Sequence, residues 1–581
     1  MMRFLVLFLA GLAAISSASI MRAYASDAAD LVLLNGKIAT VDEKFSIVEA
    51  LAVRDGKILL VGTNQEVLET KGYQTELVDL GGKMVLPGLM DSHTHPTSAS
   101  MFEFDHPVPE MESIEDVLEY IRSRTQAVAE GSWITLNQVF ITRLREQRYP
   151  TRAELDRAAP HHPVVFRTGP DAAVNSLALR LSNIDASTMA AAGGMVDKDP
   201  ASGEPTGILR GAATKLLKLP PDKTPARQAD HIERLKALFQ DYNSVGITSI
   251  ADRNADSDAI ARYLKLRDDG ELTVRIAVSH GVSPAEKIAD TQARIREVAK
   301  HPLRDGDERL RIIGIKMFQD GGMLTGSAYM REPWGVSRIY SISDPHYRGM
   351  LFIEKDALRK YVRTAVECKL QFTAHSVGDG AVHNLVEVYD EINESTSIRA
   401  TRPCITHCNF MSREAIDRMA QLGIVCDIQP AWLYLDARTL HDQFGYARMR
   451  WFQPLRSMFE SGVIAGGGSD HMQKIGSLRS VNPYNPFLGM WTTITREARR
   501  YDGQMHSEEA LSREQAIRFY TNNNAYILFL DNVAGSLEVG KLADMIVLDR
   551  DLLTCAEDEI KSTRVLRTYL GGRLVHTART Q

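Results

Sequence analysis

The sequence predicts an α/β protein built on a (β/α)8 barrel, with an inserted subdomain after the first strand and a small composite β-sandwich domain. Three observations lead to this prediction: apolar runs that alternate with helix-like stretches, β-rich patterns at both ends, and ionisable residues where several runs end. Strands that alternate with helical patterns are typical of parallel α/β architecture.

Eight strand-like apolar runs lie in the middle of the chain. They span residues 84–95, 246–252, 274–280, 310–320, 371–379, 404–410, 424–430 and 463–471. Helical patterns separate most of them, including 256–268, 285–300, 356–369 and 413–422. Eight strands with intervening helices give a (β/α)8 barrel. The gap after the first run, about 96–245, is too long for one loop and predicts the insertion.

Both ends of the chain are β-rich. Asn35-Gly36 and Asp55-Gly56 sit between strand-like runs, and such dipeptides favour hairpin turns because they tolerate positive φ. The same alternation returns at 543–576. We therefore expect residues 26–86 and 535–581 to form the composite β-sandwich, with the barrel at 87–534.

Residues 1–25 are predicted to be a secretory signal peptide. Arg3 gives a positive start, an uncharged apolar run follows, and Ala23-Tyr24-Ala25 offers a cleavage site before Ser26. The run is shorter than the roughly 20 apolar residues of a membrane span, although an uncleaved anchor is the alternative. We expect an exported, periplasmic protein with no membrane contact after cleavage.

The composition is that of an ordinary globular protein. Of 581 residues, 44% are apolar and 24% charged, and the net charge of −6 gives no electrostatic reason to expect nucleic acid as a partner. Five cysteines in so long a chain do not make a disulfide framework. A small-molecule substrate is the expected partner, and dimerisation stays open.

Ionisable residues recur at the ends of separate runs. His93 and His95 are two residues apart, so both can project from the same side of a strand. The others are Lys316, His375, His407 and Asp470. Each alone has a simpler explanation, such as a surface histidine, a strand-end lysine or a helix-capping aspartate. Together they indicate one site, because active sites of such barrels lie at the carboxyl ends of the strands.

These residue types suit a catalytic metal. Imidazole nitrogen favours an ion such as Zn2+, which lowers the pKa of bound water towards about 7 and polarises a substrate carbonyl. Asp470 is placed to take a proton from the attacking water and pass it to the leaving group. The ammonium of Lys316 cannot ligate a metal unless it is deprotonated or chemically modified.

Several motifs resemble the amidohydrolase superfamily, in its YtcJ-like (family 3) branch that includes N-substituted formamide deformylases. The stretch 85–95, ending in His93-Thr94-His95, is similar to the first-strand signature, and 535–544 is similar to the return into the β-domain. Gly314-Ile315-Lys316, 374–379, Thr406-His407 and Gly468-Ser469-Asp470 resemble motifs of the branch.

The resemblance implies one or two divalent ions, most simply Zn2+, held by His93, His95, His375 and His407 with Lys316. It also implies that Lys316 is carboxylated by CO2 to form an anionic bridge, and that Asp470 is both catalytic base and metal ligand. It gives Asp379 a supporting role. Two departures stand out: Thr168-Gly169-Pro170 replaces an Asp-Gly-His stretch, and Thr406 stands where relatives usually place a glutamate.

The leading hypothesis is metal-dependent hydrolysis of a C–N bond in an amide, formamide or cyclic amide. The same site could instead serve an ester or lactone hydrolase, or a metal-assisted isomerase or decarboxylase, since one barrel supports many reactions. A third hypothesis is that the chain is not an enzyme but an exported binding or regulatory protein with a vestigial site. Aromatic residues such as Phe318, Trp432 and Tyr434 either line a substrate pocket or pack in the core.

Overall fold

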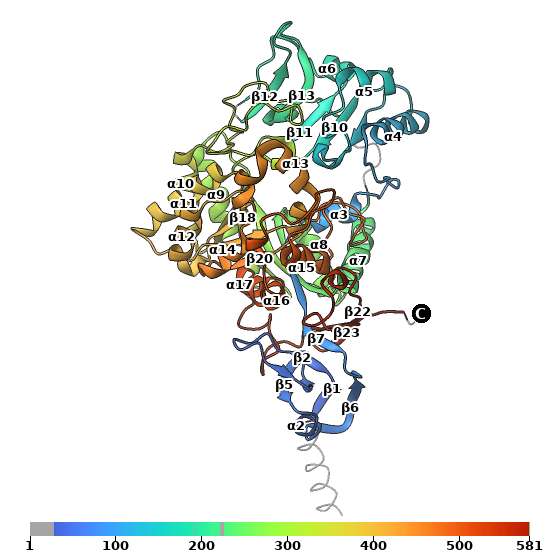
Figure 1. Cartoon of the computed structure of the whole chain (residues 1–581), viewed down its shortest axis with the longest axis vertical. Coiled ribbons are helices and arrows are strands. Elements are labelled where there is room, and N and C mark those ends of the chain that lie inside the picture. The colour runs from blue at the N-terminus through green and yellow to red at the C-terminus, as the bar shows by residue number, and fades with distance from the viewer. Residues whose placement is uncertain (1–27, 192, 221–225, 580–581) are drawn as a thin grey trace, which may run out of the picture.

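A computed structural model describes residues 28–191, 193–220 and 226–579. Three parts follow one another along its longest axis: a β-sandwich, a barrel, and a subdomain at the far end (Figure 1). The predicted signal peptide lies outside the described residues. Among those described, no helix is long and apolar enough to cross a membrane, and none of the five cysteines is paired with another.

The barrel contains eight parallel strands, each beside the next along the chain. They are β8 (Leu89–Thr94), β14 (Ile247–Ala255), β15 (Arg275–Gly281), β16 (Leu310–Phe318), β17 (Gln371–Ser376), β18 (Cys404–His407), β19 (Val425–Ile428) and β20 (Ala465–Gly467). A parallel bridge between Thr94 and His471 closes the sheet at its carboxyl end. The predicted (β/α)8 fold is confirmed.

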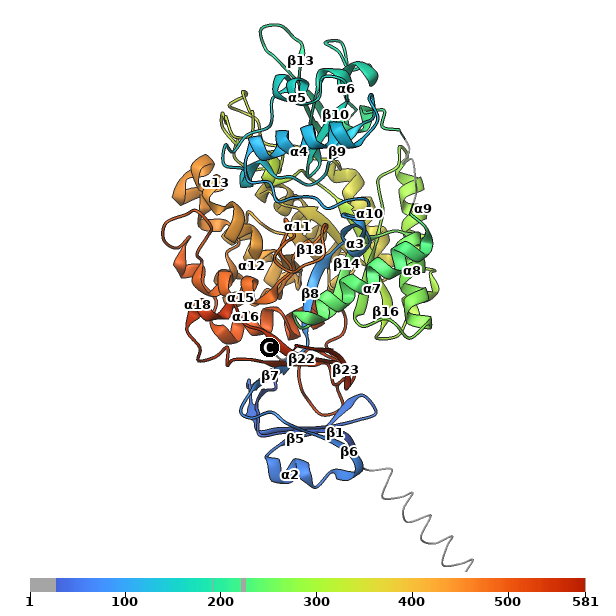
Figure 2. The ribbon, with the colours of Figure 1, turned by 90° about the vertical axis from the view of Figure 1, so that its right-hand side faces the viewer.

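Helices wrap the outside of the barrel (Figure 2). From β8 onward, the α-helices described outside the insertion are α3 (Pro96–Met101), α7 (Gln228–Ser244), α8 (Ser257–Asp268), α9 (Ile288–Val298), α10 (Lys355–Glu367), α11 (Asp379–Asn393), α12 (Arg413–Leu422), α13 (Pro430–Arg448), α14 (Leu455–Glu460), α15 (Pro486–Thr495), α16 (Arg513–Phe519), α17 (Asn522–Ile527) and α18 (Glu557–Ile560). Helix α8 shows why they form. Its N-cap Asp256 accepts a hydrogen bond from the Ala259 amide at 2.8 Å, and an apolar stripe including Ile260 and Tyr263 is buried.

The β-sandwich consists of two sheets. The first has the order β5 (Lys57–Gly62), β4 (Ala50–Arg54), β1 (Ala29–Leu34), β6 (Lys71–Asp79), with α2 (Asn64–Leu68) beside it. The second has the order β23 (Arg573–Thr577), β22 (Val565–Leu570), β21 (Met545–Leu548), β7 (Met84–Pro87), β2 (Lys37–Ala39), β3 (Ile47–Val48). Strand β7 pairs with β21, so the two ends of the chain share one sheet.

The region between β8 and β14 contains a separate five-stranded sheet. Its order is β12 (Gly194–Lys198), β13 (Pro205–Gly211), β11 (Asp171–Val174), β10 (Val164–Thr168), β9 (Ile134–Leu136). Helices α4 (Ile114–Ala127), α5 (Arg152–Ala158) and α6 (Ser176–Leu181) accompany it. We call residues 114–217 the insertion. It lies over the end of the barrel opposite the β-sandwich (Figure 1).

The insertion and the barrel loops share one apolar core. Leu136 and Phe166 of the insertion belong to the same buried cluster as Met323, Phe410 and Trp432 of the barrel loops. A shared core fixes the position of the insertion over the mouth because separating the two parts would expose that apolar surface.

Candidate metal centre

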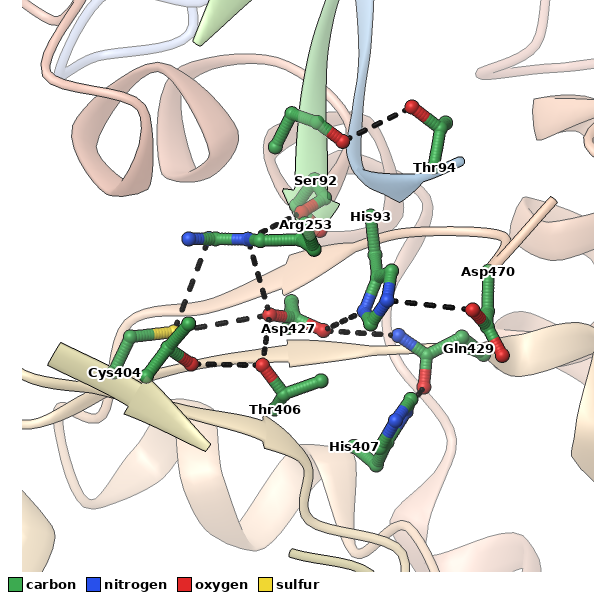
Figure 3. Close-up of polar contacts among 12 residues, drawn as sticks. Ser92, His93, Thr94, Arg253, Cys404, Thr406, His407, Asp427, Gln429 and Asp470 are labelled. Carbon is green, nitrogen blue, oxygen red and sulfur yellow. Dashed lines mark hydrogen bonds and ion pairs between the residues drawn. The ribbon is translucent and has the colours of Figure 1, made fainter. Parts of the chain in front are cut away.

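The six predicted site residues lie at the carboxyl ends of five barrel strands. His93 is in β8 and His95 directly follows it, while Asp470 lies three residues beyond β20. Lys316, His375 and His407 come from β16, β17 and β18. Figure 3 shows His93 between Asp470 and a second carboxylate, Asp427.

Three donor atoms converge on one point. His93 Nε2 lies 3.3 Å from His95 Nε2 and 3.3 Å from Asp470 Oδ1, and His95 Nε2 lies 3.0 Å from Asp470 Oδ1. Donors about 2.1 Å from one ion, at angles of about 90–110°, stand roughly 3.0–3.4 Å apart. The spacing of these nitrogen and oxygen atoms therefore fits a divalent ion held by His93, His95 and Asp470.

Asp427 orients the His93 ring. His93 Nδ1 lies 2.8 Å from Asp427 Oδ1, which leaves Nε2 to face His95. The carboxylate also accepts hydrogen bonds from Gln429 Nε2 at 3.0 Å and Thr406 Oγ1 at 3.1 Å. Although Asp427 could itself form a ligand group with His93 and His407, these contacts make it a support for His93.

His407 and His375 form the other half of the centre. His407 Nδ1 lies 2.8 Å from Gln429 Oε1, so the amide oxygen accepts and the Nε2 lone pair is available. The His375 and His407 rings are 4.4 Å apart, and the indole of Trp432 stacks on His407 at 4.9 Å. His375 Nε2 lies 3.3 Å from the Gly321 carbonyl oxygen.

Lys316 is buried beside these histidines without a polar partner. Its side chain is 1% exposed, and among the described residues its Nζ has no hydrogen-bond partner. Burial lowers the pKa of Lys316 to about 8, against the opposing charges of Asp427 and Asp470. An unpaired buried ammonium is unfavourable, so the position fits a lysine whose nitrogen is neutral or modified.

Burial also sets the charge of the other ligands. It lowers the pKa of His375 to about 3, and it holds the pKa of His93 and of His407 well below the ordinary value, with neighbouring cations and histidines acting in the same direction. These three imidazoles are neutral at physiological pH and offer lone pairs. Burial raises the pKa of Asp470, while its contact with His95 lowers it.

Two site residues have an uncommon backbone conformation. The φ angles of His407 and Asp470 are +82° and +54°, in a region that non-glycine residues occupy rarely. The chain after Asp470 is held by Asn482, whose Nδ2 donates to the Asp470 carbonyl oxygen at 2.8 Å. The surrounding structure therefore keeps the carboxylate directed at His93 and His95.

Asp320 is a further buried carboxylate near the centre. It accepts hydrogen bonds from the amides of Val377, Gly378 and Tyr329 at 2.9 to 3.0 Å, and so joins the loop after β16 to the loop after β17. Asp379 accepts from the Arg331 amide at 2.9 Å, at the surface of the same region. Both carboxylates thus hold loops at the barrel mouth, and Asp320 Oδ1 also lies 3.8 Å from His375 Nε2.

The sequence prediction missed Asp427, Asp320 and Asn482. Asp427 could have been found from the sequence, because it is an acidic residue at the centre of the apolar run 424–430. Of the aromatic candidates, Trp432 is 4% exposed and packs on His407, whereas Phe318 is 42% exposed with its ring 5.5 Å from His375. Phe318 is therefore exposed beside His375, where a bound substrate could cover its ring.

Comparison with known proteins identifies the family, since residues 76–576 match the profile described as "Amidohydrolase family". The chain belongs to the amidohydrolase family. This amidohydrolase is 30% identical to an N-substituted formamide deformylase from Arthrobacter pascens, over 94% of the chain and 98% of the relative. It is 25% identical to the YtcJ protein of Bacillus subtilis (strain 168), over 93% and 98%.

A solved structure has the same fold as this amidohydrolase. It is an uncharacterised metal-dependent hydrolase from Pyrococcus horikoshii OT3, 22% identical, with a TM-score of 0.65 over 91% of this chain and 99% of the other. The predicted membership of the superfamily and its YtcJ-like branch is confirmed. The amidohydrolase is a metal-dependent hydrolytic enzyme that acts on C–N bonds, as predicted.

Proposed function

We propose that this enzyme hydrolyses the amide bond of N-acyl or N-formyl amines, with Zn2+ as its metal and Asp470 as its proton carrier. The observation that carries the proposal is the convergence of His93 Nε2, His95 Nε2 and Asp470 Oδ1 within 3.0 to 3.3 Å of one another. The 30% identity to an N-substituted formamide deformylase supports the choice of amide over ester.

The donor set fits zinc. Two imidazole nitrogens and a carboxylate oxygen are ordinary ligands of Zn2+, and such three-ligand sites leave a position for water or substrate. When bound there, the ion would acidify water and polarise the amide carbonyl. His93 and His95 would hold it in the orientation that the Asp427 contact with His93 defines.

Asp470 is placed to move the proton. Its Oδ1 faces both histidines, while Asn482 fixes its backbone and lies 3.4 Å from Oδ2. The raised pKa of the buried Asp470 carboxyl helps it to accept a proton. In the proposed reaction, the hydroxyl of water joins the acyl carbon and the C–N bond breaks. Asp470 passes the remaining proton of the water to the leaving nitrogen, which gives a carboxylic acid and an amine.

Lys316 is the residue that we propose to be carboxylated. Its neutral amine nitrogen would bond to the carbon of CO2 and release one proton, which gives an anionic carbamate. Together with His375 and His407, the carbamate oxygens would offer ligands for a second ion. Carbon-13 NMR of protein incubated with labelled bicarbonate should show one carbamate signal, which the Lys316→Met variant lacks.

Elemental analysis of the purified mature protein, from Ser26 onward, is the first test. We expect one or two equivalents of zinc per chain and turnover of N-formyl amines. His93→Ala and His407→Ala should lower bound metal and abolish turnover, whereas Asp470→Asn should abolish turnover and retain at least one ion.

His346 provides the control because it is exposed and outside the metal centre. His346→Ala should change neither the bound metal nor the turnover. A protein that takes up no metal after incubation with zinc and bicarbonate would contradict the proposal. Faster turnover of esters than of matched amides would instead favour the ester or lactone alternative.

A further inference from the structure

A cavity of about 420 Å³ lies beside the barrel mouth. One wall comes from residues 108–112, which precede the insertion, and from residues within 137–143 of the insertion. The other wall comes from the loop 473–483 after Asp470. Apolar side chains, including Phe140 and Tyr434, form part of the lining. The volume is in the range of cavities that bind small ligands.

The cavity wall is in direct contact with the residues that hold Asp470. Arg143 lines the cavity and donates from Nη1 to Asn482 Oδ1 at 3.1 Å. Asn482 Nδ2 in turn donates to the Asp470 carbonyl oxygen at 2.8 Å. The side chain of Asn482 therefore lies between this wall and the backbone of Asp470, which places the cavity next to the metal centre.

Five cationic side chains line the cavity, and four of them already have carboxylate partners. The pairs are Arg143 with Asp436, Arg479 with Glu103, Arg499 with Glu112, and Lys561 with Asp558. Lys474 is the fifth. Within the described parts of the chain, no carboxylate oxygen lies within 4.0 Å of its Nζ, and its polar contact is the Pro109 carbonyl oxygen at 3.4 Å.

Lys474 is fixed in place although it lacks a counter-ion. The residue is 5% exposed, and its backbone has a φ of +63°. Its carbonyl oxygen accepts a hydrogen bond from His471 Nε2 at 2.8 Å, while His471 Nδ1 contacts the Tyr242 hydroxyl at 2.7 Å. Burial lowers the pKa of Lys474, with Glu103 and Glu110 opposing this from a distance. A buried cation without a paired anion is unfavourable.

We propose that Lys474 binds a carboxylate of the substrate, so that the substrates of this enzyme are N-acyl or N-formyl amino acids or similar amides that carry an acid group. The inference rests on the proposed amide hydrolysis and specifies its substrate class. The amide would lie at His93, His95 and Asp470, and the acid group would enter the cavity and pair with Lys474 Nζ.

A matched pair of substrates tests the proposal. N-Formylphenylalanine and N-formyl-2-phenylethylamine differ only in the carboxylate. We expect the intact enzyme to prefer the acid, and Lys474→Met to lower the ratio of the two kcat/KM values by on the order of 30-fold, since removing one partner of a buried charge pair has effects of that size. Lys474→Arg should retain much of the ratio.

Lys561→Met is the control, because Lys561 lines the same cavity but already pairs with Asp558 at 2.8 Å. This variant should keep the ratio of the parent enzyme. An unchanged ratio in Lys474→Met, or an equal loss with Lys561→Met, would overturn the assignment of Lys474.

A binding measurement separates this proposal from the proposed function. Calorimetry with N-formylphenylalanine and metal-free protein reports the acid site without catalysis. If the enzyme cleaves neither compound, the proposed function fails, yet binding that Lys474→Met abolishes still supports the acid site. If N-formylphenylalanine does not bind to the unmodified protein, the acid site at Lys474 is overturned, even if neutral amides are hydrolysed.

Discussion

Asp427 connects the metal centre to the interior of the barrel. One oxygen faces His93 Nδ1 at 2.8 Å, and the other lies 3.6 Å from the fully buried Arg253 guanidinium. Arg253 also donates to the Ser92 carbonyl oxygen at 3.0 Å and to Gln371 Oε1 at 2.7 Å. By accepting from His93, the Asp427 oxygen keeps the proton of His93 on Nδ1 and leaves Nε2 for the metal.

Asp427→Asn should therefore weaken metal binding while the fold stays intact. The amide is nearly the same size but has no negative charge, so it holds the Nδ1 proton of His93 less strongly. Loss of such a contact typically lowers metal affinity about 10- to 100-fold. Competition with a chelator measures the affinity. Asp417→Asn, which alters a surface pair with Arg413, should leave it unchanged, and equal affinities in both variants would contradict the role of Asp427.

Asp252 predicts a pH dependence of stability. Burial raises its pKa to about 6, although the Tyr263 hydroxyl donates to it at 2.8 Å and a nearby histidine opposes the shift. This folded-state pKa exceeds the unfolded value of about 3.9. The protonated Asp252 carboxyl therefore contributes to the free energy of unfolding below the unfolded value, and this contribution is lost as the pH rises through about 6.

Asp252→Asn removes this titration. Between pH 5 and pH 8, the free energy of unfolding of the variant should therefore gain about 1 kcal/mol relative to the unmodified protein. Urea unfolding of metal-free protein followed by circular dichroism measures the difference. The exposed Asp268→Asn provides the control, with a difference that does not change with pH. A pH-independent difference for Asp252→Asn would show that the acid is already ionised at pH 5.

At the scale of elements, β20 is shaped by three consecutive glycines. A Cβ on Gly466 would lie 2.0 Å from Asn524 Oδ1, and one on Gly467 would lie 2.7 Å from the Tyr520 ring. A Cβ on Gly468 would lie 2.9 Å from His93 Cβ. The glycines therefore let β20 approach β8 and α17 closely, which brings Asp470 to the two histidines of the first strand.

Gly468→Ala should separate β20 from β8 and disturb the metal centre. We expect a loss of about 1–3 kcal/mol in the free energy of unfolding, which is typical of an added methyl group without space, together with weaker zinc binding. Thermal unfolding and chelator competition measure the two effects. Gly322→Ala is the control, since its Cβ would have no neighbour closer than 3.8 Å. Unchanged zinc affinity in Gly468→Ala would contradict the proposed packing.

The elements show what the sequence could predict. Strand and helix patterns are local, and His93 and His95 are two residues apart, so periodicity was enough to place them on the barrel. Asp427 and Asn482 depend on contacts with His93 and Asp470 that only folding creates. The same reasoning applies to Lys474, whose lack of a counter-ion is visible only in three dimensions.

At the scale of the whole molecule, the insertion covers the barrel mouth that holds the metal centre. It covers the barrel end opposite the β-sandwich (Figure 1) and shares a core that includes Trp432, which stacks on His407. Arg210 of β13 is 1% exposed, and it donates to the Thr325 carbonyl oxygen at 3.0 Å and to the Tyr340 carbonyl oxygen at 2.6 Å. Arg210 thus ties the insertion to the long loop after β16.

Arg210→Met should loosen this boundary. The substitution leaves the buried Asp171, whose Oδ2 lies 3.6 Å from Arg210 Nη1, without its cation, and such losses amount to about 3 kcal/mol or more. We expect faster cleavage by chymotrypsin within 319–350 and lower turnover. The double variant with Asp171→Asn should recover part of the stability, because the unpaired charge is gone.

Arg122→Met, which breaks exposed pairs on α4, should stay within about 1 kcal/mol of the unmodified protein. Equal cleavage rates in the two arginine variants would show that the shared apolar core alone holds the insertion.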